Sequence, residues 1–238
     1  MKVWKIVAVA MVLLAWNLVP ARADLVRGKQ AYETGNYAQA LSVLQPLAEK
    51  GDAEAQALVA AMYLQGTGVT MDAAKGIGWL EAAVGQGHLG AQTMLGMLRM
   101  HGVDMTKDPV SGERLIRAAA EQGYLPAQYE LGMLYTIGTE VPENVEEALM
   151  WYRKAAEAGY IKAQRRLAVM YGTGFKVPLD RERMAGWIRM SAEAGDYNAQ
   201  ITLSHLYTEG DGVARDDAQA EYWYRKAEEQ LGAMRTQE

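Results

Sequence analysis

Cysteine is absent from the 238 residues, and with it every disulfide framework, thiolate nucleophile and thiol for lipid attachment. Histidine is nearly as scarce: His88, His101 and His205 stand at no spacing that coordinates zinc. Neither a serine nor a cysteine nucleophile motif accompanies them. We therefore expect no catalytic residue, no metal site and no cofactor, and we predict that the protein is not an enzyme.

An excess of positive charge is also missing. The formal net charge is −5 at pH 7 and becomes about −8 once the first 23 residues are removed. A chain of this sign is a poor partner for nucleic acid or anionic lipid. Half of the residues are apolar, which allows a sizeable core.

Residues 1–23 have the three-part pattern of a cleavable signal peptide. A basic start at Lys2 and Lys5 precedes an almost wholly apolar run over residues 6–19, and small residues at Ala21 and Ala23 follow. The alternative is a membrane anchor, but the run is shorter than the roughly 20 apolar residues that a spanning helix needs. We expect cleavage after Ala23, no insertion of the mature chain into a membrane, and a periplasmic or secreted protein.

The remaining sequence repeats with a period of 36 residues and no insertion or deletion. The repeated positions begin with a glycine and continue with an alanine, a glutamine and apolar residues at the i, i+4, i+7 spacing of one helix face. The aligned glycines are Gly51, Gly87, Gly123, Gly159 and Gly195, and the aligned glutamines are Gln56, Gln92, Gln128, Gln164 and Gln200. The repeat predicts tandem helical units.

Each unit also carries its own helix boundaries. A second glycine column predicts the end of a first helix, because glycine adopts the left-handed conformation without a Cβ clash: Gly66, Gly102, Gly138, Gly174 and Gly210. An Asp or Asn column predicts the N-cap of a second helix: Asp72, Asp108, Asn144, Asp180 and Asp216, with Pro109 in the first turn after Asp108. All four Trp residues after residue 23 occupy one column, which predicts packing residues: Trp79, Trp151, Trp187 and Trp223, with Leu115 in the same column of the second unit.

The pattern Gly-x-x-x-Ala-Gln-x-x-Leu-Gly-x-x-Tyr-x-x-Gly-x-Gly-Val, with Asp and Trp downstream, resembles the Sel-one-like (Sel1-like) repeat, a relative of the tetratricopeptide repeat. Residues 123–158 match it almost fully. The resemblance implies an all-α, right-handed superhelix (solenoid) of antiparallel helix pairs. The predicted organisation is a signal peptide (1–23), a tetratricopeptide-like first repeat that caps the solenoid (24–50), five repeats (51–86, 87–122, 123–158, 159–194 and 195–230) and a short tail (231–238).

Two repeats depart from the pattern. The second has Arg99 in the tyrosine column, and its loop over residues 102–107 lacks the second glycine. The fourth has the loop Gly174-Phe175-Lys176-Val177-Pro178. We expect these two loops to be re-shaped.

A solenoid binds through positions that its core leaves free. In tetratricopeptide-like proteins the first helices line a concave groove, so the resemblance implies that the variable stripe flanking the core face of each first helix carries the binding side chains. Methionines suit such an adaptable surface, and an arginine there can bind a carboxylate. The predicted protein-binding residues are Thr93, Met97, Met100, Tyr129, Met133, Thr136, Arg165, Val169, Ile201 and His205.

The resulting prediction is an exported adaptor or regulator that binds a protein or peptide of unknown identity. One alternative is a cell-wall-related or β-lactam-binding or hydrolysing protein, because cysteine-rich proteins with this repeat have been linked to that chemistry; here every such cysteine is missing. Another is self-association through an open C-terminal end after Gln230. For the methionines of the stripe, the alternative is that they simply fill gaps between successive repeats.

Overall fold

The computed structural model describes residues 22–235, all of whose regular elements are helices. A helix over residues 22–33 precedes eleven further helices. Their bounds are α2 Tyr37–Glu49, α3 Ala53–Gln65, α4 Ala73–Gly85, α5 Leu89–His101, α6 Pro109–Glu121, α7 Leu125–Ile137, α8 Val145–Glu157, α9 Ile161–Thr173, α10 Arg181–Glu193, α11 Tyr197–Glu209 and α12 Asp217–Arg235. The predicted signal peptide lies outside the described residues except for its last two. Among residues 22–235, no helix combines the length and the apolar character needed to cross a membrane.

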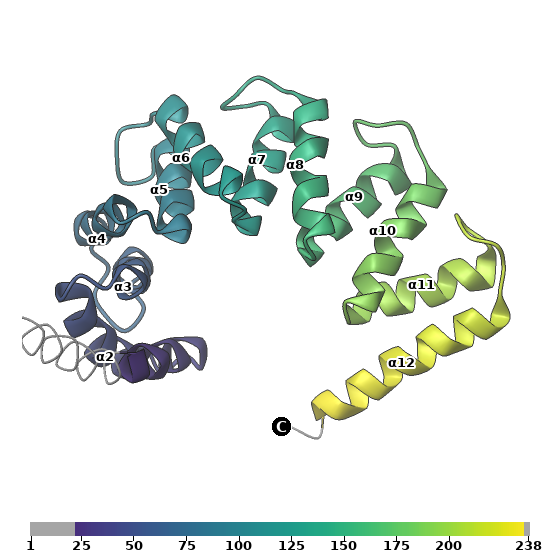
Figure 1. The fold of residues 1–238 in the computed structure, drawn as a ribbon, viewed down its shortest axis with the longest axis horizontal. Helices are drawn as coiled ribbons and strands as arrows, with labels where there is room; N and C mark the ends of the chain where they lie inside the picture. Colours follow the sequence, from purple (N-terminus) through teal and green to yellow (C-terminus); the bar gives the residue numbers. More distant parts are fainter. Residues whose placement is uncertain (1–21, 236–238) are drawn as a thin grey trace, which may run out of the picture. The chain divides into compact units, whose positions relative to one another are not determined.

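The chain forms two compact units that meet between Leu115 and Ile116, within α6. In the first unit α2 packs on α3, α3 on α4 and α4 on α5; in the second, each helix from α7 to α12 packs on the next along the chain. Figure 1 shows this order within each unit, with short loops joining consecutive helices. The fold class is the predicted one, an all-α solenoid of helix pairs.

Local sequence signals set the helix ends. The glycine that follows each first helix is left-handed, as predicted, with φ of 68° at Gly66 and 74° at Gly210. The Asp and Asn column caps the second helices: the Asp72 side chain accepts from the Lys75 amide, and the Asn144 side chain from the Glu147 amide.

The consensus glutamine ties four of the five repeats to the preceding helix. The Gln164 Nε2 donates to the Ala156 carbonyl eight residues earlier, at 2.9 Å, and the Gln200 Nε2 donates to the Ala192 carbonyl at 3.2 Å. Gln56 and Gln128 make the same bond. The glutamine therefore satisfies a carbonyl that the end of the preceding helix leaves unpaired.

The tryptophan column contributes to the core, but unevenly. Trp151 and Trp223 are 2% and 6% exposed, as predicted, whereas Trp79 and Trp187 are half-buried.

The two loops over residues 102–107 and 174–178, which we expected to be re-shaped, keep one feature of the consensus turn. Asp104 and Lys176 take φ values of 55° and 63°, in the left-handed region that Gly212 occupies at 72° in the fifth repeat. The loops thus keep this feature of the glycine-containing turn, and a non-glycine residue carries the strain.

The C-terminal helix α12 presents a polar residue where earlier repeats bury an alanine. Glu228 is exposed, although it aligns with Ala156 and Ala192, which are fully buried against the following repeat. Its Oε1 accepts a hydrogen bond from the Tyr224 hydroxyl at 3.1 Å, which raises the pKa of that phenol. A carboxylate at this position opposes close stacking of another copy on α12.

Candidate protein-binding site

The predicted stripe divides into exposed and buried members. Arg165 and His205 are exposed, Val169 is 54% exposed, and four others are half-buried: Met97, Tyr129, Met133 and Ile201. The remaining three lie in the core, with exposed fractions of 8% for Thr93, 0% for Met100 and 2% for Thr136. The prediction that these three side chains face a binding partner is wrong.

Their burial follows from the packing of the two helices in one repeat. Met100 lies against Gly112 of the following helix, so close that a Cβ on Gly112 would stand 2.9 Å from the Met100 amide nitrogen. The Thr136 hydroxyl donates to the Gly132 carbonyl at 2.6 Å and lies 3.3 Å from the Tyr152 hydroxyl. Met100 is thus a packing residue inside its own repeat.

In the second unit, α9 carries the best exposed part of the stripe. A hollow of about 300 Å³ is lined by Tyr129 of α7 and by four residues of α9, which are Lys162, Arg165, Arg166 and Val169. A second hollow, of about 360 Å³, lies among α9, α10 and α11. Arg165 and Val169 line both hollows, which therefore adjoin.

Neighbouring rings support the α7 wall of this region. The Tyr129 ring lies 5.7 Å from the rings of both Tyr152 and Tyr160. Burial raises the pKa of the Tyr160 phenol, so it is neutral at physiological pH. The Arg166 guanidinium lies 5.5 Å from the centre of the Phe175 ring. The region therefore combines aromatic faces with cationic groups, which suits protein recognition.

Lys162, Arg166 and Gly172 were not among the predicted residues. Lys162 and Arg166 stand on α9 within one turn of Arg165, so the charge pattern of this helix could have indicated them. The signal at Gly172 is a break in a column that holds larger residues in the other repeats.

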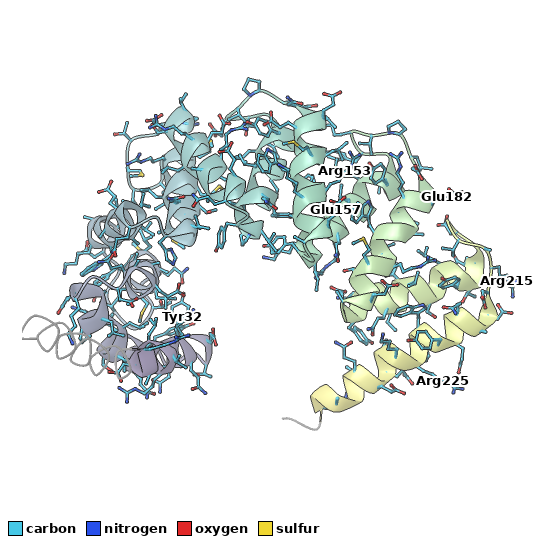
Figure 2. All side chains as sticks on the ribbon, in the orientation of Figure 1. Tyr32, Arg153, Glu157, Glu182, Arg215 and Arg225 are labelled. Carbon is cyan, nitrogen blue, oxygen red and sulfur yellow. The ribbon has the colours of Figure 1, made fainter. Side chains whose placement is uncertain are left out.

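Two larger hollows lie on the second-helix side of the same unit. One, of about 500 Å³, is lined by Arg153, Glu157 and Tyr171 among others, and one of about 930 Å³ by the equivalent Arg189, Glu193 and Tyr207. Figure 2 shows Arg153 and Glu157 one turn apart on α8. Because these hollows recur with the repeat, they are a product of the shared packing and do not single out one site.

The same packing contains an arginine–tyrosine pair in successive repeats. Arg153 donates to the Tyr171 hydroxyl at 2.8 Å, and Arg189 donates to the Tyr207 hydroxyl at 2.8 Å. In the first unit the pair becomes Glu81 and Arg99, with Arg99 Nη2 at 3.5 Å from Glu81 Oε1. The departure at Arg99 is thus matched by a change in its partner.

The hydrogen bonds of His88 give this histidine a structural role. His88 caps α5: its Nδ1 accepts from the Ala91 amide at 3.0 Å, and its Nε2 lies 3.0 Å from Glu54 Oε2. Lys29 donates to the other Glu54 oxygen at 2.5 Å. Burial opposes ionisation of Glu54, but the hydrogen bonds from Lys29 and His88 outweigh it and lower the pKa of this carboxyl. Residues 22–235 contain no group of three His, Asp or Glu side chains placed to hold a metal ion.

Tandem helix pairs, joined by a consensus glutamine and closed by a left-handed glycine, define a helical repeat protein. The Sel1 repeat model matches residues 53–88, 90–124, 125–160, 161–196 and 198–230. The chain therefore belongs to the Sel1 repeat family, a class of helical scaffold that generally mediates protein–protein interaction.

Solved structures of Sel1 repeat proteins are similar to this chain in sequence and in fold. A Sel1 repeat protein from Oxalobacter formigenes is 32% identical, with a TM-score of 0.63 over 87% of this chain and 82% of that one. The protein c5321, described as a protective antigen of uropathogenic Escherichia coli with an SLR fold, is also 32% identical, with a TM-score of 0.68 over 88% of this chain and 46% of that one. The immunity protein Pa5087 of Pseudomonas aeruginosa shares the fold at 18% identity, with a TM-score of 0.58 over 85% of this chain and 81% of that one. A comparison with curated proteins gave no match.

Proposed function

We propose that this protein is an exported adaptor or regulator that binds a protein partner on the surface formed by Tyr129, Lys162, Arg165, Arg166 and Val169, hereafter the α9 surface. The observation that carries the proposal is the joining of two hollows across Arg165 and Val169, two of the most exposed members of the variable stripe. Unlike the hollows on the second-helix side, this surface does not recur with the 36-residue period.

The chemistry of the α9 surface suits a partner segment with negative charge. Lys162 is exposed and makes no hydrogen bond or ion pair within residues 22–235. Arg165 lies 3.3 Å from Asp196, but its side chain is 55% exposed and its guanidinium retains further donors. In a chain of net charge −5, these cations form a local attractive site for a carboxylate.

The binding test starts with affinity capture by residues 24–238 and identification of the captured protein, followed by a titration of the purified pair. We expect Lys162→Ala with Arg165→Ala to weaken binding at least tenfold, or about 1.4 kcal/mol. The control is Arg215→Ala with Arg225→Ala, two exposed residues labelled in Figure 2, which removes the same charge. Within the described residues, their ion pairs are with Asp217 and Glu221 respectively. Equal losses in the two double variants, or no loss in the first, would contradict the proposal.

Export is tested separately. Expression of the full chain in a Gram-negative host, followed by fractionation and N-terminal sequencing, should give a periplasmic or secreted protein that begins at Asp24. A cytoplasmic protein that retains residues 1–23 would contradict export without affecting the binding proposal.

A further inference from the structure

In each repeat, a residue near the end of the first helix has a counterpart twelve positions later, near the start of the second helix. Four pairs place the larger residue on the first helix: Leu64 and Gly76, Met100 and Gly112, Thr136 and Ala148, and Thr208 and Ala220. The fourth repeat reverses the pair to Gly172 and Met184. A Cβ on Gly172 would lie 2.7 Å from the Met184 Sδ, whereas a Cβ on Gly76 would lie 2.6 Å from the Leu64 Cγ.

Because of this reversal, α9 has no side chain at Gly172, and the larger side chain of the pair, Met184, belongs to α10. The hollow of about 360 Å³ forms at this place, and Gly172, Met184 and Ile188 line it together with Val169. Met184 is 7% exposed and forms part of its floor, while Val169 is 54% exposed. Its volume lies at the lower end of the range of about 300–1,000 Å³ that is typical of small-molecule sites, so the hollow has room for one aliphatic side chain.

Two arginines flank the apolar part of the hollow, Arg165 from α9 and Arg181 from the start of α10. Each lies 3.3 Å from an aspartate, Asp196 and Asp211 respectively, and their side chains are 55% and 47% exposed. A guanidinium has five N–H donors, so each arginine can bind a second carboxylate while it keeps the first. The apolar hollow therefore opens beside positive charge.

We propose that this hollow binds an aliphatic side chain of a partner protein, next to an acidic residue whose carboxylate is bound by Arg165 and Arg181. The proposal rests on the proposed function and adds the recognition chemistry, an acidic–aliphatic segment. The aliphatic walls of Val169, Met184 and Ile188 supply the apolar contact. The cations supply the orientation and select against a basic segment.

The test uses the peptide acetyl-Gly-Glu-Leu-Gly-amide and the amide signals of Val169 and Ile188 in the NMR spectrum of residues 24–238. We expect both signals to move on titration and to move at least fivefold less with peptides in which Gln replaces Glu or Ser replaces Leu. The double variant Gly172→Thr with Met184→Ala reproduces the Thr136 and Ala148 pair of the third repeat, so it should fold while it moves the larger side chain back to α9 and removes the Met184 wall of the hollow. It should abolish the response to the peptide.

The outcomes separate this inference from the function on which it rests. If the peptide moves neither signal up to its solubility limit, or moves them equally in the double variant, the hollow is not the site. If the captured partner binds the wild type and the double variant equally, but loses affinity in the Lys162 and Arg165 variant, the proposed function stands and the hollow plays no part. If no partner binds the α9 surface at all, both fail.

Discussion

Replacement of Gly112 by alanine should destabilise the first unit, whereas replacement of Gly78 by alanine should stabilise it. Both glycines are helical, Gly112 in α6 and Gly78 in α4. A Cβ on Gly112 would lie 2.7 Å from the Gly96 carbonyl oxygen and 2.9 Å from the Met100 amide nitrogen. Around Gly78 nothing stands within 4 Å of the added Cβ.

The magnitudes follow from two opposing contributions. Alanine gains about 1 kcal/mol over glycine in a helix interior, and this gain applies to both positions. At Gly112 the obstructing atoms belong to the backbone, so α5 and α6 must move apart, and overpacking of this kind costs about 1–3 kcal/mol or more. We expect a net loss of up to about 2 kcal/mol for Gly112→Ala and a gain of up to about 1 kcal/mol for Gly78→Ala.

Urea unfolding followed by far-UV circular dichroism measures both variants under one condition, and thermal melting should shift by about 2–4 °C for each kcal/mol. The two midpoints should move in opposite directions from the wild type. A Gly112→Ala protein as stable as the Gly78→Ala protein would refute the close approach of α5 and α6.

Three further predictions concern the loops, a carboxylate and the arginine–tyrosine pair. Asp104→Gly should raise the free energy of unfolding by about 0.5–1 kcal/mol, because glycine adopts the left-handed conformation without strain; a lower urea midpoint would contradict this. Since the pKa of Glu54 is lowered in the fold, its contribution to stability is present above its ordinary value of 4.5 and is lost as the pH falls through the folded value. As the pH falls below 4.5 and through that folded value, the wild type should therefore lose more stability than Glu54→Gln, and parallel curves of stability against pH would refute this origin. A double-mutant cycle with Arg153→Met and Tyr171→Phe should give a coupling of about 0.5–1.5 kcal/mol in urea unfolding, and additive effects would show that the 2.8 Å contact does not stabilise the fold.

The sequence predicted the helix boundaries well because each boundary depends on nearby residues. A left-handed glycine such as Gly66 and a capping side chain such as Asp72 act within one turn of the helix that they end or begin. The 36-residue period repeats these local signals, so the order of helices and the all-α fold followed from them.

The burial of individual stripe residues was harder to predict, because it depends on the partner helix. Met100 stands where α5 approaches Gly112 of α6, and Thr136 contacts Tyr152 of α8, so both belong to the face of the first helix that meets the second helix of the same repeat. The small residue twelve positions later was the available signal. A single-helix periodicity cannot supply it, since i, i+4, i+7 spacing does not say which neighbour a face meets.

The candidate site was predicted in part. Arg165 and Val169 stand in the expected stripe and are exposed, but the hollow beside them depends on the exchange of bulk between Gly172 and Met184. Such an exchange is visible only when both columns are compared together. The match between Glu81 and Arg99 is of the same kind, because one changed residue is explained by the other.

The most direct test of the central claim is hydrogen–deuterium exchange of residues 24–238 with and without the captured partner. The account predicts slower exchange in Ile161–Thr173 and at the adjoining start of α11, with α8 and the outer face of α12 unchanged. Protection confined to α8 and α12, with none in α9, would contradict the claim that this protein holds its partner on the α9 surface.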